Sequence, residues 1–332
     1  MVPSLFSDFV RIENNSGDAA IYTIQDTGFL QPAVLEFGGG SGSGFYRHTW
    51  PVFAAAGRPA PFPRLRLDMR SGPLEDIYRT YADENRLTVP GSELARKIPD
   101  VSFDTFSKSV MLKLDFWKFD RFSTVEKIVP RMPAHALVHL VSFWPRAFDQ
   151  NYPDSLPPEK KFGSLADLQR LNSEIRRSGR LTMPYTNPTW WNESPTMQKL
   201  GPEKISARKR SGESLTESYG PNSGWVISPW LPAARDRRRR TTGEFTSIVP
   251  TDVLFEDQLA AREFQIDWNP AAPGPLSYLS GIREIAREKG GQIPLMTEGA
   301  WDALVPYEAG FCNVLGPLDR PPESPGYDQW FG

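Results

Sequence analysis

Two acidic residues end two neighbouring apolar runs of the sequence. Asp257 ends the run Val253–Asp257 (VLFED), and Glu298 ends the run Ile293–Glu298 (IPLMTE). Runs that are continuous in Val, Ile, Leu, Phe or Met are typical of strands buried in a parallel sheet. Cleavage of a glycosidic bond needs two carboxyl groups, one to donate a proton and one to act as nucleophile or base. The pair therefore predicts glycoside hydrolysis.

The segment between the two acids predicts how they are positioned. A loop that includes residues 270–275 leads into a helical stretch over 276–291 and then into the second strand. Strand, loop, helix and strand is the repeat of a (β/α) barrel, in which catalytic residues lie at the carboxyl ends of the strands. Neighbouring strands lie ~4.8 Å apart, which suits the ~5–9.5 Å that separates the two carboxyl groups of glycosidases.

The two side chains suggest separate roles. We expect Asp257 to be the nucleophile, because its short side chain is held rigidly at a strand end. We expect Glu298 to be the general acid/base, because its longer side chain can reach a leaving oxygen. Glu256 is the competing acid, but alternation along the strand turns it away from the face of Asp257. The structural alternative for Asp257 is an N-cap or an ion pair with Arg262. For Glu298 it is an ion pair with one of the many arginines.

Further polar and aromatic residues follow the predicted strands. The chain has ten tryptophans, and aromatic rings stack on the C–H faces of sugars, although a single tryptophan is as readily a core or interface residue. Acids such as Asp149 could equally cap turns beside proline. The predicted substrate-binding residues follow the first strand (Trp144, Asp149, Tyr152, Asp154), the second (Tyr185, Asn187, Trp190, Trp191), the third (Trp230, Arg235), Asp257 (Gln258, Arg262) and Glu298 (Trp301).

The periodicity divides the chain in two. Residues 1–125 predict a partial β-sandwich-like region with a linker helix, because they hold short β segments separated by Gly and Pro. Its predicted elements are hairpins around Asn15–Asp18 and Gly38–Gly44, a helix over Pro73–Asn85 and a half-buried strand over 110–116. Residues 126–332 predict the barrel, with strands over 135–143, 180–186, 224–230, 253–257, 293–298 and 309–316, and with helices over 164–179, around the basic run 234–240, and over 276–291.

The number of strands predicts an incomplete barrel. Six strands are two βα units short of a closed (β/α)₈ barrel, or roughly 60 residues. The expected fold class is thus α/β, a TIM-like barrel incomplete at its C-terminus and preceded by the partial β-sandwich. We expect a truncated piece of a longer enzyme.

Composition excludes several other classes. Lys and Arg number 38 against 40 Asp and Glu, a net charge of −2, so neither nucleic acid nor an anionic membrane is expected as a partner. The single cysteine, Cys312, excludes a disulfide framework, and no motif calls for a metal or a cofactor. No signal peptide or apolar run of ~18 residues is visible, so the chain as written is expected to be cytoplasmic. The oligomeric state stays open.

Several motifs resemble those of a largely uncharacterised bacterial family. They are FWPRAFDQNYPDSLPP, PYTNPTWW, SPWLPAAR, VLFEDQLAAR with DWNPAAPGP, and LMTEGAWD. The family carries a domain-of-unknown-function label and a glycoside-hydrolase-like TIM barrel, related to retaining α-glycosidases such as the endo-α-N-acetylgalactosaminidases. The resemblance implies retaining chemistry on an oligosaccharide or glycoconjugate, with Asp257 as nucleophile and Glu298 as acid/base. The alternative is a non-catalytic carbohydrate-binding barrel or an inactive fragment of a longer glycosidase.

Overall fold

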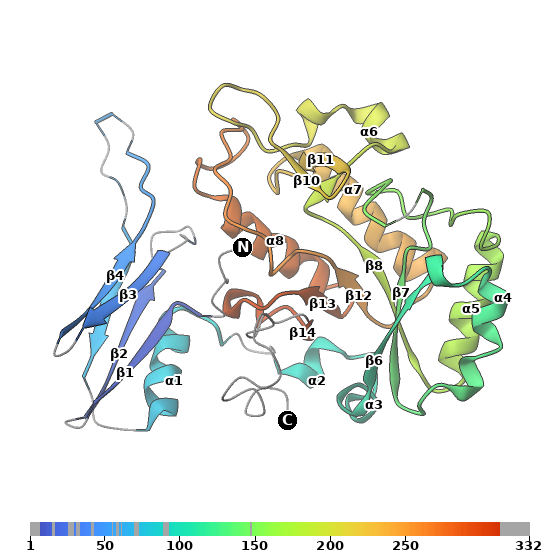
Figure 1. Cartoon of the computed structure of the whole chain (residues 1–332), viewed down its shortest axis with the longest axis horizontal. Coiled ribbons are helices and arrows are strands. Elements are labelled where there is room, and N and C mark those ends of the chain that lie inside the picture. Colours follow the sequence, from blue (N-terminus) through green and yellow to red (C-terminus); the bar gives the residue numbers. More distant parts are fainter. Residues whose placement is uncertain are drawn as a thin grey trace.

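A curled parallel sheet is the centre of the fold (Figure 1). The computed structural model describes residues 7–14, 17–25, 30, 34–40, 43–54, 56–57, 60, 62–69, 73–88, 93–146 and 148–312. Within them, six strands are each parallel to their neighbours, in the order β6 (Val110–Asp115), β7 (Ala136–Val141), β8 (Leu181–Thr186), β12 (Leu254–Glu256), β13 (Leu295–Glu298) and β14 (Gly310–Cys312). The α/β class and the curled half-barrel agree with the predicted partial barrel.

Two strands differ from the sequence prediction. The half-buried strand expected before the barrel is β6, which pairs with β7 from Val110 to Asp115, so the sheet begins upstream of residue 126. The prediction of a barrel strand over 224–230 is wrong. β11 (Asn222–Val226) instead joins β9 (Trp190–Trp191) and β10 (Thr216–Tyr219) in a separate antiparallel sheet. β8 therefore pairs directly with β12, and the division of the chain at residue 126 stays a prediction.

The helices begin and end where local sequence signals predict. Ser164 caps α5 (Leu165–Arg177) in a capping box with Asp167, and Gly179 follows with a left-handed φ of 80°. The remaining helices of the barrel region are α4 (Phe122–Glu126), α6 (Pro195–Leu200), α7 (Pro232–Gly243) and α8 (Tyr278–Gly290). Shorter helical turns are η1 (Phe116–Lys118), η2 (Val129–Arg131), η3 (Pro202–Lys204), η4 (Glu244–Ile248) and η5 (Asp302–Leu304).

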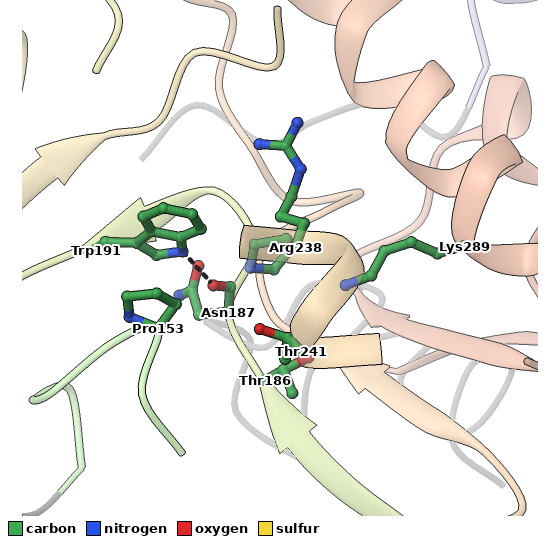
Figure 2. A pocket seen from close by; sticks show the side chains of 8 residues that line it. Pro153, Thr186, Asn187, Trp191, Arg238, Thr241 and Lys289 are labelled. Carbon is green, nitrogen blue, oxygen red and sulfur yellow. Dashed lines mark hydrogen bonds between the residues drawn. The ribbon is translucent and has the colours of Figure 1, made fainter. Parts of the chain in front are cut away.

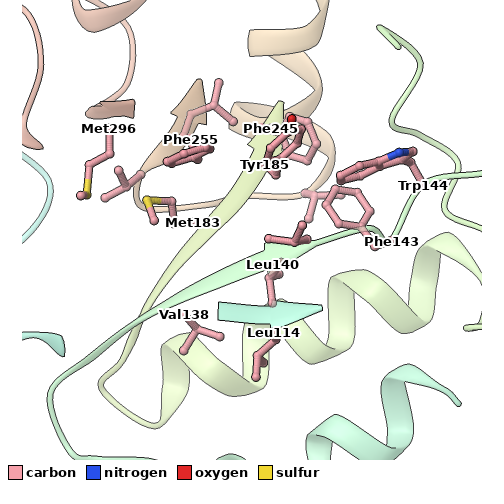
Figure 3. Close-up of a cluster of buried hydrophobic side chains, with 14 of the residues drawn as sticks. Leu114, Val138, Leu140, Phe143, Trp144, Met183, Tyr185, Phe245, Phe255 and Met296 are labelled. Atoms are coloured by element: carbon pink, nitrogen blue, oxygen red, sulfur yellow. The ribbon is translucent and has the colours of Figure 1, made fainter. Parts of the chain in front are cut away.

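Side chains alternate between the two faces of the sheet. Val138 and Leu140 point toward α5, whereas Met183, Tyr185 and Phe255 lie together on the other side (Figure 3). We call the face away from the helices the inner face. Because β12 and β13 pair Phe255 with Met296, residues two positions further along both strands also belong to the inner face.

Antiparallel strands and short helices form the N-terminal part. β1 (Phe9–Asn14), β2 (Gly17–Ile24) and β5 (Arg64–Asp68) make one sheet, and β3 (Val34–Gly40) with β4 (Ser43–Thr49) makes a hairpin. Three helices follow: α1 (Leu74–Glu84), α2 (Leu94–Lys97) and α3 (Phe103–Lys108). Both predicted hairpins and the first helix are confirmed, although residues 15–16 and 41–42 lie outside the described residues. A β-sandwich stays a prediction.

No helix in the described part of the chain is both long and apolar enough to cross a membrane. The predicted last strand is present as β14, and residues 313–316 of that prediction lie outside the described residues.

Candidate active site

Asp257 and Glu298 lie side by side at the carboxyl ends of adjacent strands. Glu256 pairs with Thr297 in the register of β12 and β13, so the next residue of each strand brings Asp257 beside Glu298. Both side chains are half-buried and belong to the inner face by alternation. They are close enough for a hydrogen bond between the two carboxyl groups to affect the pKa of Asp257.

The surroundings of Asp257 favour its protonated form. Burial, chiefly, and the negative charges of Glu298 and Asp149 raise the pKa of the Asp257 carboxyl group to about 8, against the lowering effect of Tyr185. A carboxyl group with a pKa this high is mostly protonated at neutral pH.

Asn187 orients the Asp257 carboxyl group. Its Nδ2 donates to Asp257 Oδ2 at 3.0 Å. Its Oδ1 accepts from the backbone amides of Thr189 at 3.1 Å and Trp190 at 2.9 Å. The two backbone donors fix which end of the amide faces the loop, so the other end presents N–H to Asp257.

Tyr185 connects the acid pair to a layer of aromatic rings. It is buried and stacks on Trp144, with ring centroids 5.0 Å apart, and on Tyr152 at 5.8 Å. Its hydroxyl lies at the Asp257 carboxyl group, where it lowers the pKa of that group, but no described residue forms a well-directed hydrogen bond with it. A buried hydroxyl in that position is available to a ligand.

Asp149 brings a third carboxyl group to the site. Burial raises the pKa of Asp149 to about 6, the Tyr152 hydroxyl lowers it, and the charge of Glu298 raises it. The Tyr152 hydroxyl is 3.4 Å from Asp149 Oδ1. The structure thus brings Asp149, Tyr152 and Tyr185 of the predicted set together with the acid pair.

The backbone around these residues is unusual. Six non-glycine residues of the described part have left-handed φ values, and five lie after β7 or β12: Ser142 (58°), Arg146 (79°), Asp149 (56°), Asn151 (64°) and Gln258 (62°). Such conformations cost of order 1–3 kcal/mol each and cluster at functional sites. The sequence analysis did not detect this signal, because none of the five is a glycine.

Gln258 and Arg262 form a polar cluster directly after Asp257. Gln258 Oε1 accepts from Thr189 Oγ1 at 3.3 Å and from Arg262 Nη1 at 3.2 Å. Arg262 also forms an ion pair with Glu217 at 2.6 Å, a residue on β10 that the sequence analysis did not single out. Trp301 packs against the apolar cluster around Leu259, Ala260 and Leu304.

Five other predicted site residues make contacts within the protein, and their role in binding sugar stays a prediction. Trp190 and Trp191 are fully buried, and Trp191 Nε1 donates to the Asn187 carbonyl oxygen at 2.9 Å. Asp154 accepts from Thr196 and forms a 3.1 Å ion pair with buried Arg237. Trp230, in the turn before α7, lies against Gly281 of α8, and Arg235 of α7 pairs with Glu288.

Lys113 and Cys312 lie near the site and were not predicted. Burial, chiefly, and the charges of Glu298 and Asp257 raise the pKa of the Cys312 thiol to about 12, against the lowering effect of Lys113. Cys312 is the register partner of Glu298 on β14. Lys113 belongs to the inner face of β6 and pairs with His139 of β7. A lysine within a predicted strand was the sequence signal that could have identified it.

Glu256 lies on the opposite side of the sheet, as alternation predicts. It is fully buried, forms an ion pair with Lys289 of α8 and accepts from Thr186 Oγ1 at 3.1 Å. Figure 2 shows Lys289, Thr186, Asn187 and Arg238 around a cavity of about 10 Å³, enough for a single water molecule. This side is a buried charged layer, and Asn187 connects it to the acid pair through its hydrogen bond to Asp257.

The fold is similar to that of two solved glycosidases. The α-N-acetylgalactosaminidase NagBb from Bifidobacterium bifidum, ligand free, matches with a TM-score of 0.75 at 16% identity over 96% of this chain and 57% of that chain. The α-galactosidase TtGalA from Thermus thermophilus in complex with stachyose matches with a TM-score of 0.56 at 14% identity over 92% and 58%. The chain spans little more than half the length of either. These two likenesses show a glycosidase-like fold. No family model and no curated protein matches the sequence.

Proposed function

We propose that the chain carries the catalytic residues of a retaining α-glycosidase that acts on an oligosaccharide or glycoconjugate. The observation that carries the proposal is the acid pair: Asp257 and Glu298 follow paired positions of adjacent strands on the same face of the sheet, and the charge of Glu298 helps to raise the pKa of Asp257 to about 8. Retaining cleavage starts from one ionised and one protonated carboxyl group. The ~4.8 Å spacing of adjacent strands suits the ~5–5.5 Å separation of retaining enzymes.

Each carboxyl group then has a defined task. Asp257 attacks the anomeric carbon while Glu298 gives its proton to the leaving oxygen, so the glycosidic bond breaks as the bond to Asp257 forms. Glu298 next removes a proton from water, the water oxygen displaces Asp257, and the sugar leaves with its configuration retained. In the first step Asp257 acts in its ionised form, which the Asn187 donor stabilises against the effects of burial and of the neighbouring negative charges.

The surrounding polar groups are proposed to bind the sugar. The Tyr185 hydroxyl and the Asp149 carboxyl group supply a donor and an acceptor beside the pair. Gln258 extends the polar surface after Asp257. The two similar structures are by name an α-N-acetylgalactosaminidase and an α-galactosidase, so α-linked N-acetylgalactosamine and galactose are the substrates to try first.

A panel of p-nitrophenyl α- and β-glycosides tests the proposal, starting with these two sugars. We expect an α-glycoside to be cleaved with retention of configuration, and Asp257→Asn and Glu298→Gln each to lower kcat by about 10³-fold or more. Azide should partly restore Glu298→Gln turnover of a substrate with a good leaving group. Full activity in Asp257→Asn would exclude it as nucleophile. Binding of sugars without any cleavage would favour the carbohydrate-binding alternative.

A further inference from the structure

Hydrogen bonds from the N-terminal part converge on the segment between β13 and β14. The Tyr81 hydroxyl of α1 donates to Asp302 Oδ2 at 2.5 Å, and both side chains are buried, at 3% and 4% exposure. The Lys97 ammonium of α2 donates to the carbonyl oxygens of Val305 at 2.7 Å and Glu308 at 2.6 Å. In Figure 1, α1 and the N-terminal strands lie next to this end of the sheet and away from β7.

The segment that Tyr81 contacts begins immediately after Glu298. Gly299 has a left-handed φ of 74°, and a Cβ there would lie 2.9 Å from Ala261 of the loop that follows Asp257. Thr297 Oγ1 accepts from the Ala260 backbone amide of that same loop at 3.2 Å. The loops after Asp257 and Glu298 therefore pack directly on each other, so a shift of one changes the separation of the two acids.

We propose that Tyr81 is a positioning residue, which fixes the loop 299–304 through Asp302 and thereby sets the placement of Glu298 relative to Asp257. The effect of Tyr81 on catalysis rests on the proposed function. The hydrogen bond joins residues 221 positions apart, and it makes the N-terminal part a component of the site and not a separate module. Misplacement of a catalytic group by ~1 Å can cost about 10²-fold in rate.

The experiment compares Tyr81→Phe with Tyr22→Phe in the full chain. Tyr22 is a matched control, because it is also buried and its hydroxyl donates to Glu84 at 2.9 Å within the N-terminal part. For Tyr81→Phe we expect hydrogen exchange of the backbone amides of 299–304 to accelerate by about tenfold. We also expect kcat to fall about tenfold while KM changes less than about twofold. Tyr22→Phe should change neither quantity.

Two results would overturn the proposal. One is equal exchange of residues 299–304 in the two variants, and the other is faster exchange in Tyr81→Phe with an unchanged kcat. If Tyr81→Phe does not fold, Asp302→Ala removes the same contact from the barrel side and is judged by the same measurements. A wild-type chain that cleaves no glycoside would defeat the proposed function, whereas the exchange measurement would still decide whether Tyr81 holds the loop.

Discussion

Glu256 and Asp257 are neighbours in the sequence and lie in opposite environments. Glu256 faces the helices, where the ammonium group of Lys289 compensates its charge. Asp257 faces the other way, where Glu298 and Asp149 add charge of the same sign. A buried acid paired with a cation holds the fold together, whereas a buried acid beside other acids lowers stability and holds a proton near neutral pH.

The difference shows that burial alone does not identify a catalytic acid. Glu256 is fully buried and Asp257 is half-buried at the end of the same short strand, and the charges that surround the two side chains differ in sign. The sign of the neighbouring charges and the face of the strand are therefore the two properties to change in order to test the assignment.

The largest change in stability is expected from the compensated acid. Glu256→Gln leaves the Lys289 ammonium buried without its carboxylate, so the free energy of unfolding should fall by about 3–5 kcal/mol. Urea titration measures this change. The kcat of the folded fraction should stay within about twofold of the wild type, because Glu256 does not face the acid pair. A loss of under about 1 kcal/mol would contradict the structural role of the pair.

The matched control removes both charges. Glu256→Gln combined with Lys289→Met should be less destabilised than the sum of the two single variants, because neither charge is then left uncompensated. Additive losses would mean that the two side chains act independently.

Asp257→Asn should have the opposite effect on stability, and the effect should depend on pH. The pKa of Asp257 is raised from 3.8 to about 8, so between these values the folded chain binds a proton that the unfolded chain lacks. The stability from this proton is fully present below about pH 4 and is lost as the pH rises through about 8. Asp257→Asn should therefore be more stable than the wild type at pH 8 and nearly equal to it at pH 4.

Thermal unfolding of both proteins at pH 4, 6 and 8 checks this prediction. Asp302 and Asp149, with pKa values raised to about 7 and about 6, chiefly by burial, act in the same direction. The wild type should thus lose stability over this range, and Asp257→Asn should lose less. A stability difference that does not change with pH would contradict the raised pKa of Asp257.

A smaller effect is expected at Asn187, which holds the nucleophile. Asn187→Ala removes the donor to Asp257 Oδ2, and a hydrogen bond to a charged group is worth about 1.5–3 kcal/mol, so kcat/KM should fall about 10–100-fold. Asn187→Asp keeps an acceptor for the amides of Thr189 and Trp190 but puts a negative charge beside Asp257. It should lose at least as much activity, and near-normal kcat/KM in this variant would exclude the donor role.

The local elements and the placement of the two acids could be predicted from the sequence. Continuous apolar runs identified β8, β12 and β13, and strand alternation separated Glu256 from Asp257. Caps and periodicity located α1 and α5. These features depend on residues close together in the chain, so composition and spacing contain the information.

Long-range features could not be predicted in the same way. The run 224–230 is as apolar as a barrel strand, but its partners are Trp190 and Trp191, and this pairing removes both rings from solvent. The left-handed backbone at Asp149 and the contact of Tyr81 with Asp302 depend on the assembled fold. The sequence likewise did not show that several of the aromatic residues predicted to bind sugar are buried in the core.

The smallest effect is expected at Arg235. The sequence predicts that this residue binds substrate, and in the structure it lies on α7. Its guanidinium is about half exposed and donates to Glu288 Oε2 of α8 at 3.0 Å, and Glu288 keeps a second partner in Arg239. Exposed ion pairs contribute about 0–1 kcal/mol, so Arg235→Ala should lower the free energy of unfolding by less than about 1 kcal/mol and leave KM within about twofold of the wild type. Steady-state kinetics beside Asn187→Ala measures both residues on one scale. A tenfold rise in KM would mean that Arg235 contacts the sugar. Such a contact would require α7 to approach the end of β12 when substrate binds.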